Sequence, residues 1–119
     1  MATVELTRAL PVLPVTDVKA ASAFYRERLG FELAFEMGDY AGVARGPIEI
    51  HLDGSPSRPS SGVSCRIDVR GVDALYAEIE PKGVVKPDEK LETKPWGLRQ
   101  FSVLDPAGNR ITFAERTPR

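Results

Sequence analysis

The sequence predicts an α+β fold made of two tandem βαβββ modules in a single chain of 119 residues. Three observations lead to this class. Short stretches that alternate apolar and polar residues, typical of half-buried strands, are interrupted by two stretches with helical periodicity. This order of elements then repeats, since Val15 and Val69 are 54 positions apart, as are Val18 and Val72. The chain finally ends in a hairpin marked by strong turn residues.

The first module begins with an apolar stretch, Ala9–Val15, whose two prolines favour an edge strand or a terminal arm over a central strand. Asp17 is placed to cap a helix that ends at Gly30. One face of this helix is apolar and consists of Val18, Ala21, Tyr25 and Leu29. Three strands separated by short turns complete the module, at Phe31–Met37, Tyr40–Ala44 and Ile48–Leu52.

The second module follows a Ser/Pro-rich linker at residues 54–62. It starts with a strand at Val63–Val69, and a helix is then marked by Val72, Leu75, Tyr76 and Ile79. Pro81 and Gly83 close this helix. The charged loop 83–95 has room for one short strand. We therefore expect one domain with module one at about residues 9–53 and module two at about 63–116.

The terminal hairpin is centred on Asp105-Pro106-Ala107-Gly108-Asn109. Pro106 presets φ at the second turn position, and Gly108 and Asn109 both tolerate the left-handed region. The hairpin begins after an exposed Trp96-Gly97 pair. Its apolar positions alternate with polar ones, at Phe101, Val103, Ile111 and Phe113. Because Ile48 and Ile111 are 63 positions apart, the second module has about nine extra residues, and they fall in the loop before Trp96, where binding function is often located.

Composition excludes several classes of function. The chain is 42% hydrophobic and 28% charged, with a formal net charge of -1, so no basic stretch indicates a nucleic-acid partner. No apolar run approaches a membrane span, and no signal peptide is recognisable. The single cysteine, Cys65, rules out an intrachain disulfide and fits a reducing compartment. We expect a cytoplasmic protein.

Two motifs point to a known family. Residues 96–113 read W-G-x-R-x-F-x-V-x-D-P-x-G-N-x-I-x-F, and the first helix contains FYRERLGF. Both resemble the bleomycin-resistance branch of the vicinal-oxygen-chelate (glyoxalase/dioxygenase) superfamily, and the resemblance covers residues 9–115. It implies an incurved mixed sheet with helices outside and a concave ligand cup inside. It also implies a homodimer with interfacial clefts, which protects by sequestering a bleomycin- or phleomycin-type antibiotic unaltered.

Strand alternation predicts which side chains face the cup. Apolar partners such as Ile50 and Ile67 would pack under the helices, so their polar neighbours point the other way. Polar residues that share a concave face are candidates for ligand binding. Trp96 would either cover the end of the sheet or form a stacking wall for a planar or cationic ligand. The predicted ligand-binding residues are Phe35, Tyr40, Glu49, His51, Ser64, Arg66, Trp96 and Thr112.

The metal-dependent members of the superfamily hold a divalent ion at four cup positions, which by register fall here on Leu10, Glu49, Ser64 and Thr112. Leu10 offers no lone pair, and hydroxyl groups are weak ligands. Only Glu49 would serve, with His51 as a second ligand if the register slips. We therefore predict no metal, no cofactor and no catalytic residue.

Several interpretations compete with a ligand site. Phe35 fits a core position better than the cup, Cys65 reads as a small buried hydrophobe, and the charged run 86–94 reads as a solvated loop. Binding and sequestration of a glycopeptide antibiotic is the favoured function. The alternatives are a metal-dependent glyoxalase- or dioxygenase-type lyase or isomerase, and a binder of another aromatic metabolite.

Overall fold

The computed structural model describes residues 3–55 and 62–118, so most of the predicted linker lies outside the described residues. Module one consists of β1 (Val12–Pro14), α1 (Val18–Arg28), β2 (Glu32–Met37), β3 (Tyr40–Arg45) and β4 (Ile48–Asp53). Module two consists of β5 (Ser64–Asp68), α2 (Val72–Ile79), the 3₁₀ turn η1 (Glu80–Lys82), β6 (Glu92–Thr93), β7 (Leu98–Leu104) and β8 (Arg110–Arg116).

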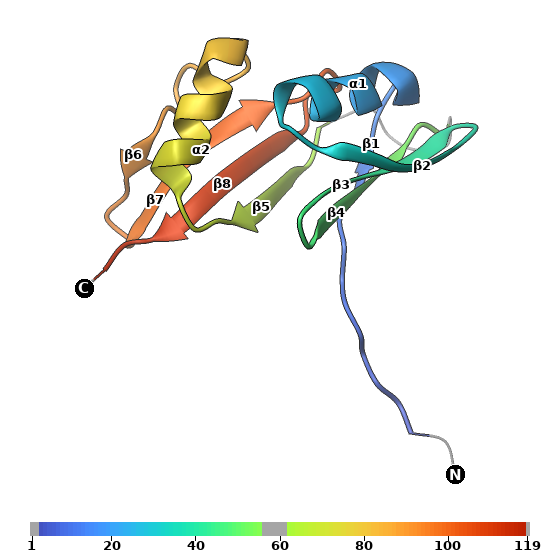
Figure 1. Ribbon diagram of the computed structural model, residues 1–119, viewed down its shortest axis with the longest axis horizontal. Helices are drawn as coiled ribbons and strands as arrows, with labels where there is room; N and C mark the ends of the chain where they lie inside the picture. Colours follow the sequence, from blue (N-terminus) through green and yellow to red (C-terminus); the bar gives the residue numbers. More distant parts are fainter. Residues whose placement is uncertain (1–2, 56–61, 119) are drawn as a thin grey trace.

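The two modules form two four-stranded sheets with equivalent strand orders, β1-β4-β3-β2 and β5-β8-β7-β6 (Figure 1). In each sheet the first and last strands of the module run parallel, and the remaining neighbours are antiparallel. The helices begin at Val18 and Val72, in the register that the internal repeat predicts. The predicted fold class, two tandem βαβββ modules, is confirmed.

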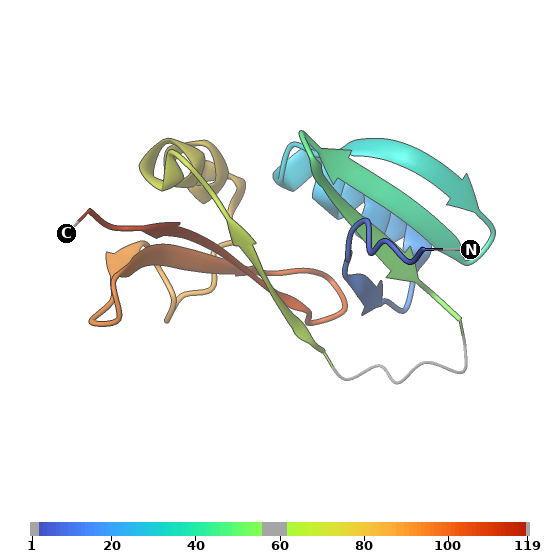
Figure 2. The ribbon, with the colours of Figure 1, turned by 90° about the horizontal axis from the view of Figure 1, so that it is seen from below.

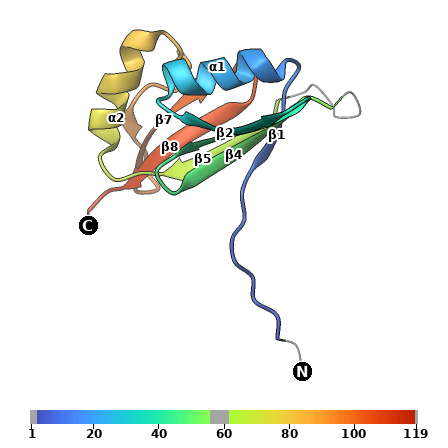
Figure 3. The ribbon, with the colours of Figure 1, turned by 45° about the vertical axis from the view of Figure 1, so that its right-hand side comes forward.

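Both helices lie on the same side of the two sheets (Figures 1 and 3). Asp17 caps α1 as predicted, because its Oδ1 accepts a hydrogen bond of 3.1 Å from the Ala20 amide. The apolar face of α1 is buried, and Tyr25 has no exposed surface. The N-terminus of α2 is capped by a residue that is distant in sequence, since Glu115 on β8 accepts hydrogen bonds from the amides of Gly71 and Val72 at 3.0 Å.

The terminal turn joins the two modules as well as closing the hairpin. The Asp105 carboxylate accepts hydrogen bonds from the Tyr25 hydroxyl at 2.8 Å and from the side-chain amide of Asn109 at 2.9 Å. The same Asn109 amide donates to the Pro14 carbonyl at 2.8 Å, and Asn109 Oδ1 accepts from the Val63 amide at 3.0 Å. Burial and the neighbouring Asp105 carboxylate raise the pKa of the Tyr25 hydroxyl well above its usual range. This buried network fastens α1 and β1 to the second module.

Of the two turn residues that tolerate the left-handed region, only Gly108 adopts it. Gly108 takes a left-handed conformation, with φ of 84°, but Asn109 does not, since only glycines have positive φ among the described residues. Asn109 instead contributes through its fully buried side chain.

A second connection between the modules lies on the helix side. The Arg45 guanidinium forms a bidentate ion pair with Glu78 of α2, at 2.8 and 3.0 Å. It also donates a hydrogen bond of 2.9 Å to the Leu29 carbonyl. Beneath this pair is a cleft of about 380 Å³ with Phe31 and Phe113 in its lining. None of the predicted ligand-binding residues lines this cleft.

Candidate functional site

Three rings form a cluster on the face of the first sheet that is turned away from α1. Tyr40 and His51 lie on this face because they alternate with Ala41 and Leu52, which are buried on the helix side. The Phe35 ring stacks with Tyr40 at 6.0 Å between centroids and meets His51 edge-on at 5.1 Å. Figure 2, seen from below, shows this side of the molecule, with strands of the first sheet in front of α1.

Gly42 makes room for this ring cluster. Phe35 pairs with Gly42 across β2 and β3, and its ring lies over the glycine. A Cβ atom at position 42 would overlap with the ring carbons of Phe35. The interpretation of Phe35 as a core residue is therefore wrong, because its ring lies outside the hydrophobic core, beside Tyr40 and His51.

A hydrogen-bonded chain runs through the cluster. The Tyr40 hydroxyl lies 2.8 Å from His51 Nδ1, and His51 Nε2 lies 2.6 Å from Glu49 Oε2. Arg8 reaches the other oxygen of Glu49 at 3.4 Å. The hydrogen bond from His51, followed by that from Arg8, lowers the pKa of the Glu49 carboxyl, so this group is ionised at neutral pH.

Glu49 also borders a cavity where the two sheets approach each other. This cavity of about 370 Å³ is lined by residues 8–11 of the N-terminal segment, the start of β4, and β5. Arg66 contributes to it and forms an ion pair of 3.0 Å with Asp68. Ser64 is exposed on the same strand. Arg66 and Glu49 therefore share one cavity, as the prediction that both face the cup requires.

Thr112 takes a different position from the one expected of a ligand contact. Its side chain is buried, and its hydroxyl is 2.8 Å from the Ser102 hydroxyl on β7. Both partners are covered, so Thr112 supports the interior of the second module rather than offering a free group.

The loop 86–94 is not simply solvated. Glu89 packs toward the sheet, where its carboxylate accepts from Arg110 at 2.6 Å and pairs with Lys86 at 3.2 Å. Desolvation opposes the charged form, but hydrogen bonds from Ser102, Arg110 and Lys86 outweigh it and lower the pKa of Glu89 to about 2. This ion cluster fixes the inserted loop against β7 and β8.

Trp96 is 62% exposed and lies in a separate hollow of about 240 Å³ on the second module. Its ring nitrogen donates a long hydrogen bond of 3.4 Å to Gln100, and Lys94 Nζ lies 5.9 Å from the ring centroid. Trp96 therefore presents an accessible aromatic face, and a cation of the protein itself already lies over its ring.

The residues present disfavour metal-dependent chemistry and chemistry at the Cys65 thiol. Leu10 has no donor atom, Thr112 is buried, and within residues 3–55 and 62–118 no three His, Cys, Asp or Glu side chains are grouped as metal ligands. Cys65 is half-buried against the core, and burial followed by Asp105 raises the pKa of its thiol. In the described part of the chain, no helix is long and apolar enough to cross a bilayer.

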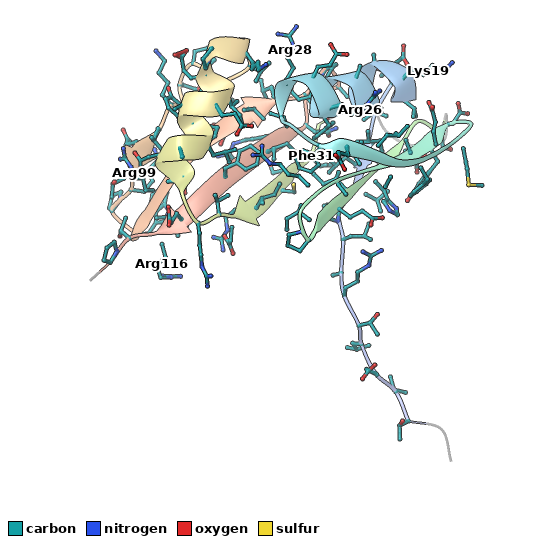
Figure 4. All side chains as sticks on the ribbon, in the orientation of Figure 1. Lys19, Arg26, Arg28, Phe31, Arg99 and Arg116 are labelled. Carbon is teal, nitrogen blue, oxygen red and sulfur yellow. The ribbon has the colours of Figure 1, made fainter. Side chains whose placement is uncertain are left out.

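Several basic side chains lie along α1, on the helix side of the sheets. Figure 4 shows Lys19, Arg26 and Arg28 along α1, on the helix side of the sheets. The face that carries the rings has Glu49 as the carboxylate nearest to His51. Arg8 lies 3.4 Å from the same carboxylate and offsets its charge.

Within one chain, the structure assembles half of the predicted set. Phe35, Tyr40, Glu49 and His51 lie together, whereas Trp96 lines its own hollow on the second module. Sequence reasoning missed Gly42, whose only signal was a glycine inside a strand, which often marks a close approach of another group.

Comparisons with known proteins agree with this architecture. The profile of a family described as "Glyoxalase superfamily protein" matches residues 1–118. A bleomycin resistance protein from Geobacillus stearothermophilus is 32% identical over 129 residues, covering 93% of this chain and 98% of that protein.

Two solved structures extend the comparison. A bleomycin-binding protein from the bleomycin-producing Streptomyces verticillus, solved with copper(II)-bleomycin, is 31% identical with a TM-score of 0.75, covering 98% of this chain and 100% of that one. The antibiotic-binding protein TnmS3 from Streptomyces sp. CB03234 is 28% identical with a TM-score of 0.79, covering 97% and 100%.

Proposed function

The chain belongs to the glyoxalase superfamily, and from this premise we propose that it binds a glycopeptide antibiotic of the bleomycin or phleomycin type and sequesters it unaltered. The observation that carries the proposal is the ring cluster of Phe35, Tyr40 and His51 on the open face of the first sheet. Flat aromatic groups stack on such clusters, and ring faces also attract cationic groups. The lone Cys65 suits action in a reducing cytoplasm.

Protection by this route requires binding alone. A drug molecule held by the protein is withdrawn from the free pool, so the fraction that reaches its target falls by mass action. Neither a nucleophile nor an acid–base pair is needed. This matches the residues present, since Cys65 faces the core and the one imidazole is hydrogen-bonded on both nitrogens.

A metal-dependent lyase or dioxygenase is disfavoured by the donor set. Of the four positions that hold the ion in metal-dependent relatives, Leu10 has no lone pair and the Thr112 hydroxyl is bonded to Ser102. Glu49 is the only carboxylate among the four, and it already accepts from His51 and Arg8. A Lewis acid needs several such donors converging on one point.

Calorimetric titration of the purified protein with metal-free bleomycin tests the proposal. We expect saturable binding at one drug per chain that is unchanged by EDTA, because no residue of the site requires a metal. The glutathione hemithioacetal of methylglyoxal is the control for glyoxalase activity, and no turnover is expected. Turnover that EDTA abolishes, without drug binding, would contradict sequestration. Binding of another aromatic antibiotic in place of bleomycin would reassign the ligand.

We further propose that the protein is a homodimer and that a second copy completes the site. The N-terminal segment extends away from the sheets (Figures 1 and 3), and Val4 and Leu6 are 88% and 94% exposed on it. An extended segment with alternating apolar residues is suited to pair with the sheet of another copy. A partner module facing the ring cluster would also supply the second wall that a single chain lacks, and Trp96 is the exposed aromatic available for it.

Sedimentation at micromolar concentration tests the dimer. We expect a species of twice 13.0 kDa for the wild type, and a shift to the monomer when Val4 and Leu6 are both replaced by aspartate, because charges replace the apolar contacts. Thr7→Asp is the control, since it places a charge on the other side of the extended segment. A wild type that sediments only at 13.0 kDa would refute the dimer and the shared site.

A further inference from the structure

The chain of hydrogen bonds from Glu49 through His51 to Tyr40 has a direction that its end group determines. An ionised carboxylate can only accept hydrogen bonds, and the pKa of Glu49 is lowered by its contacts with His51 and Arg8. The hydrogen between Glu49 and His51 must therefore belong to Nε2 of the imidazole. When the imidazole is neutral it carries one N–H, and Nδ1 then has only a lone pair.

Tyr40 is consequently the donor in its contact with His51. The hydroxyl oxygen lies 2.8 Å from Nδ1, and a bare Nδ1 can only accept. The single hydroxyl hydrogen of Tyr40 is thus used within the protein. What remains for a ligand is the lone-pair side of the oxygen, next to the stacked ring of Phe35.

We propose that Tyr40 accepts a hydrogen bond from an N–H or ammonium group of the bound ligand, and that His51 and Glu49 are positioning residues that keep Tyr40 an acceptor. The proposal rests on the function proposed above and specifies its ligand chemistry. The ligand group at this point is planar, so that it stacks on Phe35, and it carries a hydrogen-bond donor on its edge. Ligands with an acceptor at the same place are rejected, because two lone pairs would meet.

The tautomer of His51 can be measured directly, without any ligand. His51 is the only histidine of the chain, so ¹⁵N spectra of the imidazole report this residue alone. We expect the Nε2–H tautomer in the wild type at pH 8. Glu49→Gln replaces a pure acceptor by an amide that can donate or accept, so the preference for that tautomer should be lost.

Binding of metal-free bleomycin provides the second readout. Tyr40→Phe keeps the ring and removes the acceptor, and we expect affinity to fall about tenfold, the size of one lost hydrogen bond to a charged donor. His51→Leu should produce a similar loss, whereas His51→Gln should retain more affinity, because its amide can accept from Tyr40 and donate to Glu49. Tyr76→Phe on α2 is the matched control, with affinity equal to the wild type.

Each result bears on a separate claim. An Nδ1–H tautomer in the wild type would overturn the acceptor role of Tyr40. So would full affinity of Tyr40→Phe in a protein that binds bleomycin, and this result would leave the proposed function intact. An unchanged tautomer in Glu49→Gln would overturn the positioning role of Glu49, because its carboxylate would then not determine which nitrogen carries the proton. Absence of bleomycin binding to the wild type would instead refute the proposed function, and the ligand contact of Tyr40 with it.

Discussion

Replacing Asp105 with alanine should lower the free energy of unfolding by about 3 kcal/mol or more, because several buried donors lose their acceptor at once. Asp105 is 5% exposed and accepts four hydrogen bonds, from the Tyr25 hydroxyl, the Ala107 and Asn109 amides and the Asn109 side chain. The network also joins the two modules, since Tyr25 of module one and Asp105 of module two are 80 positions apart in the sequence. Urea unfolding of the variant measures the loss.

Two further variants make this result specific. Tyr25→Phe removes one donor and keeps the ring in the core, so a smaller loss of about 1–2 kcal/mol is expected. In the double variant the losses should not add, because the same contact is removed twice. Asp88→Ala is the control, since its exposed ion pair with Lys86 contributes little. An Asp105→Ala protein with the urea midpoint of the wild type would show that the turn does not hold the modules together.

This network marks the limit of what the sequence predicted about the turn. Pro106 and Gly108 identified a hairpin because their backbone preferences are local. Tyr25, which donates to Asp105, and Pro14, which accepts from Asn109, lie in the first module, and no local pattern contains either hydrogen bond. Helix starts, edge position of β1 and the internal repeat were predictable for the opposite reason, because capping residues, prolines and periodicity act within a few residues.

Phe35 shows how a single irregularity changes a prediction of the site. Strict alternation from the buried Phe31 places positions 33 and 35 on the core face. In the structure the register shifts between Leu33 and Phe35, so Leu33 pairs with Val43 and Phe35 pairs with Gly42. This bulge turns the Phe35 ring to the opposite face. Glu49 and His51 were predicted correctly to share that face because β4 pairs with β3 without a shift.

The inserted loop could not be interpreted from composition for a related reason. Charged runs are usually solvated, but Glu89 meets Arg110, which lies 21 positions later on β8. The pairing depends on how the loop folds back on the sheet, and the charges alone do not specify it.

Replacing Trp96 with alanine should weaken bleomycin binding about tenfold or more, because an aromatic stack and its contact area are lost together. The side chain is 62% exposed, so its removal should leave the unfolding free energy nearly unchanged. Trp96→Phe keeps an aromatic face and should retain most of the affinity. Lys94 lies 5.9 Å from the ring centroid, so a cationic drug group competes with it, and Lys94→Ala should bind at least as tightly as the wild type.

Trp96 is the only tryptophan of the chain, so its emission reports this position without interference from another indole. Titration with metal-free bleomycin should change the emission saturably, and the midpoint should agree with calorimetry on the same protein. In the proposed dimer the ring cluster of one copy faces Trp96 of the other, so Phe35→Ala should weaken the emission change as well as the affinity. A flat emission trace in a protein that calorimetry shows to bind bleomycin would place the drug away from Trp96, and the pairing of Trp96 with Phe35 across two copies would then be wrong.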